Sequence, residues 1–140
     1  MRNDRFLSLV LFLVFIFISC REEIIPPGNF AGDINEPVQE NSLNYFSFMI
    51  NAQDFTYSFF VNTNFNYSTT KIIISVFDRT SGSITIRVKD ESGFSMFNKK
   101  MDSNKSDIYQ KFTGYLPSRV EISSSNFTGK FKISLSDSYD

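Results

Sequence analysis

The chain of 140 residues contains no histidine and no tryptophan, and its only cysteine is Cys20. The absence of histidine removes the commonest general base, the commonest metal ligand and the Ser-His-Asp triad of hydrolases. A single cysteine cannot form a disulfide within the chain, so the fold must be held together by packing alone. The usual groups of nucleophilic and metal-dependent catalysis are therefore missing.

Two further absences exclude classes of ligand. No Gly-rich phosphate loop of a nucleotide or dinucleotide site occurs in the sequence. The net charge is −1, and Lys and Arg form no basic block, whereas nucleic-acid phosphates require clustered Lys and Arg. We therefore expect no cofactor and no nucleic-acid partner.

Carboxylates remain, since glycoside hydrolysis needs only two Asp or Glu side chains that flank a cleft. Most of the acids fall in predicted turns, where Asp is favoured for hydrogen bonds with the backbone. Residues 102–107 have the spacing of a calcium loop, but Asp107 stands where the loop needs Gly and Thr113 where it needs Glu. We predict no enzyme and no metal site; a two-carboxylate hydrolase and a looser oxygen-lined calcium site are the alternatives.

The first 20 residues carry the clearest pattern in the chain. Arg2 and Arg5 give a positive start, residues 6–18 are apolar except for Ser8, and Cys20 follows directly. The apolar run fits the roughly 7–15 residues of a secretory signal. It is shorter than the ~20 residues that a transmembrane helix needs.

This arrangement resembles a bacterial lipoprotein signal, in which the cysteine at the cleavage point is joined to diacylglycerol and becomes the new N-terminus. The resemblance implies that residues 1–19 are removed and that Cys20 carries two or three acyl chains, such as palmitate. Two or more chains make membrane attachment durable. The alternatives are an ordinary secreted protein with a spare cysteine and an uncleaved signal anchor.

The next three residues, Arg21, Glu22 and Glu23, are one basic residue followed by two acidic ones. In Bacteroidetes lipoproteins, such a triplet just after the lipidated cysteine resembles the signal for export to the outer face of the outer membrane. The expected location is the cell surface. The alternative is a solvated charge cluster at the head of a linker.

We divide the rest of the chain into a flexible linker, residues 20–42, and a folded domain, residues 43–140. The linker contains three prolines and two glycines among polar residues, a composition typical of semi-extended spacers. A domain of about 100 residues is long enough to bury a core without disulfides.

Short apolar runs with alternating character predict strands throughout the domain. Residues 43–50 and 55–61 flank the turn-prone Asn51-Ala52-Gln53-Asp54, which predicts a hairpin. The clearest strand is 83–89, in which Ile84, Ile86 and Val88 alternate with polar residues. Residues 94–110 are less regular and favour a short strand followed by a loop. The remaining predicted strands span 71–77, 108–112, 119–123 and 130–136, with turns at 78–82, 90–93 and 126–129.

Seven or eight short strands with turns every 8–12 residues predict an all-β fold, an antiparallel β-sandwich. A small β-barrel is the alternative. The motifs Tyr109-Gln110-Lys111-Phe112 and residues 127–133 (FTGKFKI) resemble those of small Bacteroidetes lipoproteins. That resemblance implies an immunoglobulin-like sandwich without an inherited active site.

Adjacent aromatic residues place rings on both faces of a predicted strand, so one ring of each pair can enter the core while its neighbour needs another partner. We select Phe46, Phe60, Phe65 and Tyr67 as a candidate binding surface for a protein or glycan ligand; burial of these rings under loops is the alternative. The expected function is a surface lipoprotein that acts as a non-catalytic binding or adhesion module. An accessory or structural subunit of an envelope complex is the alternative.

The lipoprotein interpretation predicts the chemical form of the N-terminus. Mass spectrometry of the native protein is expected to find a chain that begins at Cys20 and carries acyl chains. An unacylated chain that still contains residues 1–19 would contradict the interpretation.

Overall fold

The computed structural model describes residues 33–138, apart from the side chains of residues 106 and 107. The predicted signal, Cys20 and the export triplet Arg21, Glu22 and Glu23 lie outside the described residues. Within the described residues the strands are β1 (Val38–Ser42), β2 (Tyr45–Asn62), β3 (Thr69–Asp90), β4 (Ser95–Met101), β5 (Lys105–Thr113) and β6 (Pro117–Asp137). Within residues 33–138 no helix is long and apolar enough to cross a membrane.

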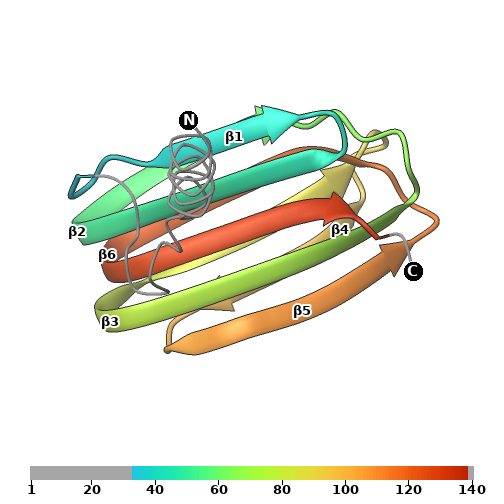
Figure 1. The fold of residues 1–140 in the computed structure, drawn as a ribbon. Coiled ribbons are helices and arrows are strands. Elements are labelled where there is room, and N and C mark those ends of the chain that lie inside the picture. The colour runs from blue at the N-terminus through green and yellow to red at the C-terminus, as the bar shows by residue number, and fades with distance from the viewer. Residues whose placement is uncertain (1–32, 139–140) are drawn as a thin grey trace, which may run out of the picture.

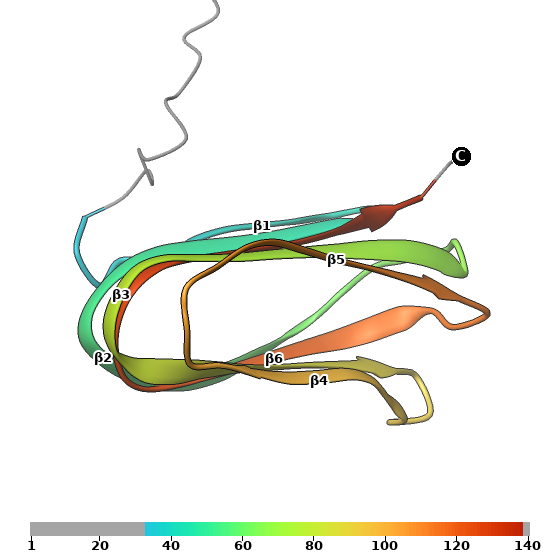
Figure 2. The same ribbon diagram turned by 90° about the horizontal axis from the view of Figure 1, so that it is seen from below.

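All of the strand pairs are antiparallel, and the order across the sheet is β1-β2-β6-β3-β4, with β5 also paired to β3. The strands β2, β3 and β6 are long enough to bend and run back beneath themselves, as the view along the layers shows (Figure 2). The first layer holds β1, β5 and residues 45–52, 129–137 and 69–77 of the long strands (Figure 1). The second layer holds β4 and residues 55–62, 117–124 and 83–90.

The structure therefore confirms an all-β, antiparallel sandwich built from an open sheet. The strand number differs from the predicted seven or eight, because three strands each serve both layers. The predicted hairpin turn at residues 51–54 is wrong, since the chain continues through it as one strand, β2. The predicted turn at 78–82 likewise lies inside β3.

The three bends are made by residues that tolerate a positive φ angle. Asp54, Asp78 and Asn126 have φ between 45° and 51°, and each lies where its strand leaves regular pairing. Asn and Asp are enriched in this conformation, and an extra unpaired residue bends a strand sharply. These residue types also favour tight turns, which is why the sequence suggested hairpins here.

The core lies between the two layers and is formed by alternate residues of the long strands. Ile84, Ile86 and Val88 are buried as predicted, and they share one core cluster with Val120, Ile122 and Phe127 of β6. Each fully buried aliphatic or aromatic side chain contributes about 1.5–3 kcal/mol. The other buried apolar side chains are Phe46, Phe48, Ile50, Ala52, Phe65, Ile72, Ile74, Val76, Phe97, Met101, Phe131, Ile133 and Leu135.

Two segments differ from their predicted roles. β1 lies in the last part of the predicted linker, where Val38 pairs with Met49 and Ser42 with Tyr45. All five residues of β1 are exposed, and the four after Val38 are polar, so neither hydrophobicity nor alternation marked them as a strand. The short strand predicted within residues 94–110 is β4, but the loop after it covers only residues 102–104, because β5 begins at Lys105.

The glycine at the bend of β3 against β6 is predicted not to tolerate substitution. Gly82 has a φ of +68°, and a Cβ there would collide with the backbone of Ser125 and Asn126. We expect Gly82→Ala to lower the free energy of unfolding by at least about 2 kcal/mol, from the strained conformation and the clash together. Chemical denaturation measures the change.

Gly93→Ala is the matched control. Gly93 has a φ of +83°, but a Cβ there meets nothing within 4 Å, so only the conformational cost of about 1 kcal/mol is expected. Equal losses for the two variants would contradict the importance of the backbone contact at the bend.

Candidate functional site

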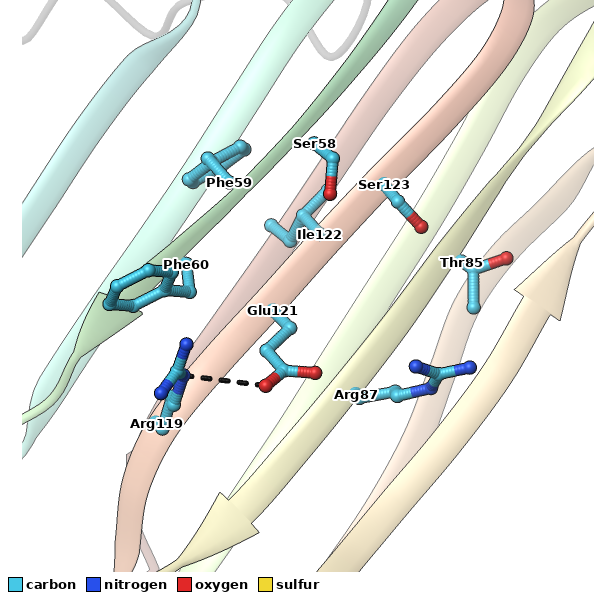
Figure 3. Close-up of a pocket in the computed structure, with 9 residues that line it drawn as sticks. All are labelled: Ser58, Phe59, Phe60, Thr85, Arg87, Arg119, Glu121, Ile122 and Ser123. Carbon is cyan, nitrogen blue, oxygen red and sulfur yellow. Dashed lines mark ion pairs between the residues drawn. The ribbon is translucent and has the colours of Figure 1, made fainter.

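A shallow hollow of about 220 Å³ lies on the outer face of the second layer, where β2, β6 and β3 run side by side (Figure 3). The strand alternation that buries Ile86, Val88 and Ile122 turns the residues between them outward. The hollow is lined by Ser58, Phe59, Phe60, Thr85, Arg87, Arg119, Glu121, Ile122 and Ser123.

The sheet register arranges the outward side chains in rows across the strands. Ser58, Ser123 and Thr85 form a row of hydroxyl groups, because Ser58 and Thr85 both pair with Ser123. The next row contains Phe60, Glu121 and Arg87 in the same way. Cross-strand neighbours have Cβ atoms about 4.5–5.5 Å apart, so each row brings its side chains together without help from a loop.

Glu121 stands at the centre of a group of cations. Lys89 Nζ donates a hydrogen bond to Glu121 Oε1 over 2.8 Å. Arg119 Nε lies 3.3 Å from the same oxygen, a charge contact without a hydrogen bond. Arg87 is the cross-strand neighbour of Glu121 on the other side from Phe60. One carboxylate thus faces three cations.

The cations act on the ionisation of Glu121. The hydrogen bond from Lys89 lowers the pKa of Glu121 most strongly, and the charges of Lys89, Arg119 and Arg87 act in the same direction. Partial burial opposes them by disfavouring the charged form. The pKa of Glu121 lies below its ordinary value, so the carboxylate stays ionised at neutral pH.

Phe60 and Arg119 form the aromatic side of the hollow. The guanidinium carbon of Arg119 lies 3.6 Å from the centre of the Phe60 ring, a cation–π contact. Phe60 nevertheless remains 55% exposed. The guanidinium group covers part of the ring, and the ring still presents apolar surface to a ligand.

Arg87 and the row of hydroxyl groups retain their binding capacity. Arg87 is exposed, and within residues 33–138 its guanidinium forms neither an ion pair nor a hydrogen bond. In the same part of the chain the hydroxyls of Ser58, Thr85 and Ser123 bond no other protein group. A planar cation with five donors lies beside three hydroxyls that can each donate and accept.

Of the four residues predicted from the sequence as a candidate binding surface, two are buried and two are exposed. Phe46 is fully buried and Phe65 is 8% exposed. Both belong to the core cluster, Phe46 from an inward position of β2 and Phe65 from the segment between β2 and β3. Phe60 and Tyr67 are 55% and 45% exposed, and of the four only Phe60 lines the hollow.

Sequence reasoning missed the charged residues of the site. The alternation in residues 83–89 and 119–123 placed Arg87, Arg119 and Glu121 on outer faces, but their neighbourhood depends on the pairing of β6 with both β2 and β3. That pairing joins distant parts of the chain. No group of three or more Asp, Glu, His or Cys side chains that could hold a metal ion occurs among the described residues.

The chain matches no protein-family model and no curated protein sequence. Its fold is similar to that of a chain in a structure of Bacillus endospore appendages, described as a family of disulfide-linked pili. The two chains share 15% sequence identity, and the match covers 80% of this chain and 99% of the other with a TM-score of 0.43. A likeness this distant carries no function from one chain to the other.

The ion cluster predicts a pH-dependent contribution to stability. Because the pKa of Glu121 is lowered by folding, its stabilising effect is complete above the unfolded pKa and is lost as the pH falls through the folded pKa. We expect Glu121→Gln to cost about 0.5–1 kcal/mol at pH 7. The difference from the unchanged protein should shrink as the pH falls from the ordinary glutamate pKa of 4.5 toward the lowered pKa of Glu121 in the folded protein.

Asp78→Asn is the control, because Asp78 pairs with Lys130 at 2.8 Å while its side chain is 70% exposed. Such an exposed pair is expected to contribute less than about 0.5 kcal/mol. Urea denaturation of the three proteins at several pH values measures the effects. A Glu121→Gln deficit that stays constant between pH 7 and pH 3 would contradict the assignment.

Proposed function

We propose that the protein is a lipid-anchored module of the bacterial outer membrane that faces the cell exterior and binds a ligand without catalysing a reaction. The ligand contacts the outer face of the second layer, at the hollow between Phe60 and Arg87. The single observation that carries the binding role is this hollow, in which unpaired donors and an exposed ring converge on a sheet.

The anchor is supported by the sequence. An apolar core, Ser19 and the only cysteine of the chain follow one another in the order of a lipoprotein signal. The first described residues, 33–37, lie beside β2, where Ile34 bridges Asn51 and Asn35 exchanges hydrogen bonds with Gln53. The chain therefore joins the sandwich at the bend, and the hollow lies on the outer face of the layer that does not contain β1.

The rigidity of the site supports binding. All of the residues lining the hollow belong to the three central strands, which pair along both layers. Side chains on paired strands keep their positions better than those on loops, so they lose little freedom when a ligand binds. A binding module with a fixed face fits these properties.

The chemistry of the hollow supports a role without catalysis. Glu121 is the one carboxylate among the lining residues, and Lys89 keeps it ionised. Glycoside hydrolysis needs a second carboxyl group that can donate a proton. Hydroxyls, guanidinium groups and a single carboxylate can bind a polar ligand but offer no acid–base pair.

The location is tested on intact cells treated with an added protease. We expect the protein to be degraded while a periplasmic marker protein is protected. A chain with Arg21, Glu22 and Glu23 all changed to Ala is the matched variant, since it keeps Cys20. It should remain in the membrane fraction but become protected from the protease.

Cys20→Ala separates anchoring from export. That variant is expected to leave the membrane fraction altogether, because no acyl chain can be attached. Protection of the unchanged protein in intact cells would refute the surface location, and retention of the Cys20→Ala chain in washed membranes would refute the lipid anchor.

A further inference from the structure

We propose that the ligand of the hollow is an acidic saccharide, which is a refinement that rests on the proposed binding function. Arg87, with Lys100 beside it, binds a carboxylate or sulfate group of the sugar. The hydroxyls of Ser58, Thr85 and Ser123 bind its hydroxyl groups. Phe60 packs against the apolar face of a sugar ring.

The excess of positive charge on this face favours an anionic ligand. Lys89 and Arg119 form ion pairs with Glu121, the single carboxylate of the hollow. Arg87 lies across the strands from Glu121 but forms no ion pair within residues 33–138, so three cations face one anion. Lys100 pairs with Thr85 across β4 and β3, so it lies on the same face next to Arg87, and it is exposed. Two cations without a carboxylate between them attract an anionic group and hold it best through the forked donors of the arginine.

The acids at the Lys89 end of the hollow do not cancel this excess. Asp90 lies at the turn after β3, on the Lys89 side of the hollow. Its carboxylate accepts hydrogen bonds from Ser92 Oγ and the Phe94 backbone N–H over 2.6 and 2.8 Å. Glu91 lies at the same turn, beyond Lys89. The positive end of the face is therefore the end formed by Arg87 and Lys100.

The uncharged part of the hollow fits a sugar better than a peptide. Three neighbouring hydroxyls can each donate and accept, as sugar hydroxyls do. Sheet-binding peptides add along a strand edge through backbone hydrogen bonds, whereas Glu121 and Ser123 are on β6, which is paired on both sides. The exposed face of Phe60 offers the flat apolar surface that the C–H side of a sugar ring can cover.

The size of the hollow limits what can be enclosed. Its volume of about 220 Å³ is below the ~300–1,000 Å³ of pockets that bury drug-sized ligands. The hollow is open, so one charged sugar unit can sit in it while a longer chain continues over the sheet. The ligand is therefore one acidic unit of an oligosaccharide or polysaccharide.

The test uses calorimetric titration of the full mature chain in a non-ionic detergent. The probe is a trimer of galacturonic acid, and its fully methyl-esterified form is the neutral counterpart. We expect the acid form to bind, the ester to bind at least about tenfold more weakly, and the affinity to fall as salt is added. Arg87→Gln should weaken binding of the acid by about tenfold or more.

Lys132→Gln is the matched control, because it removes the same charge from an exposed lysine on the outer face of the other layer. Its affinity should equal that of the unchanged protein. Arg87 is exposed, so its variant is expected to fold, and a thermal unfolding curve verifies this. Equal losses for Arg87→Gln and Lys132→Gln would overturn the proposed site.

The remaining outcomes separate this inference from the proposed function. Equal binding of tri-glutamate, or of inorganic sulfate alone, would overturn the saccharide. Equal binding of the ester and the acid, with loss of both in Ser123→Arg, would overturn the acidic ligand but leave the binding face intact. Absence of saccharide binding by a protein that is surface-exposed and lipidated would overturn the inference and leave the anchored module untouched.

Discussion

The sandwich depends on the close contact of two backbones, those of β3 and β6, where these strands bend together with β2 from one layer into the other. At that point Gly82 of β3 lies directly against the Ser125–Asn126 backbone of β6, and Gly129 of β6 lies against Arg79 of β3. A side chain at either glycine would hold β3 and β6 apart. The strands could then not stay paired from one layer into the other. Because the same strands form both layers, the positions of the layers relative to each other are fixed by covalent chain as well as by packing.

The candidate site is a direct product of this arrangement. The central position of β6, between β2 and β3 in both layers, brings Glu121 between Phe60 and Arg87. The residues on either side of Glu121 in β6, Val120 and Ile122, face inward and are fully or almost fully buried. They hold the strand against the first layer. The outer side chains are thus presented by a packed surface, and each is oriented by the pleat rather than by a flexible loop.

The sequence predicted features that depend on the pattern within one strand. It did not predict features that depend on how strands distant in the chain pair with one another. The alternation in residues 83–89 predicted both the buried Ile84, Ile86 and Val88 and the outward direction of Arg87. By contrast, Asn51–Asp54 contains residue types that serve a hairpin turn and a strand bulge equally well, and only the tertiary contacts decide between them. The pair Phe59-Phe60 could not reveal which ring faces outward, and the polar β1 had no pattern to distinguish it from a spacer.

The non-local pairing of β2 with β6 also has a consequence for biogenesis. Tyr45, at the start of the domain, pairs with Ser136, close to its end, and β6 separates β2 from β3 throughout. Until β6 has been synthesised, the edges of β2 and β3 that pair with β6 have no partner, and the core lacks its central strand. Contacts of such long sequence separation form slowly. The sandwich can therefore close only after residues 117–137 have been synthesised, so its folding follows the synthesis of all the strands from β1 to β6.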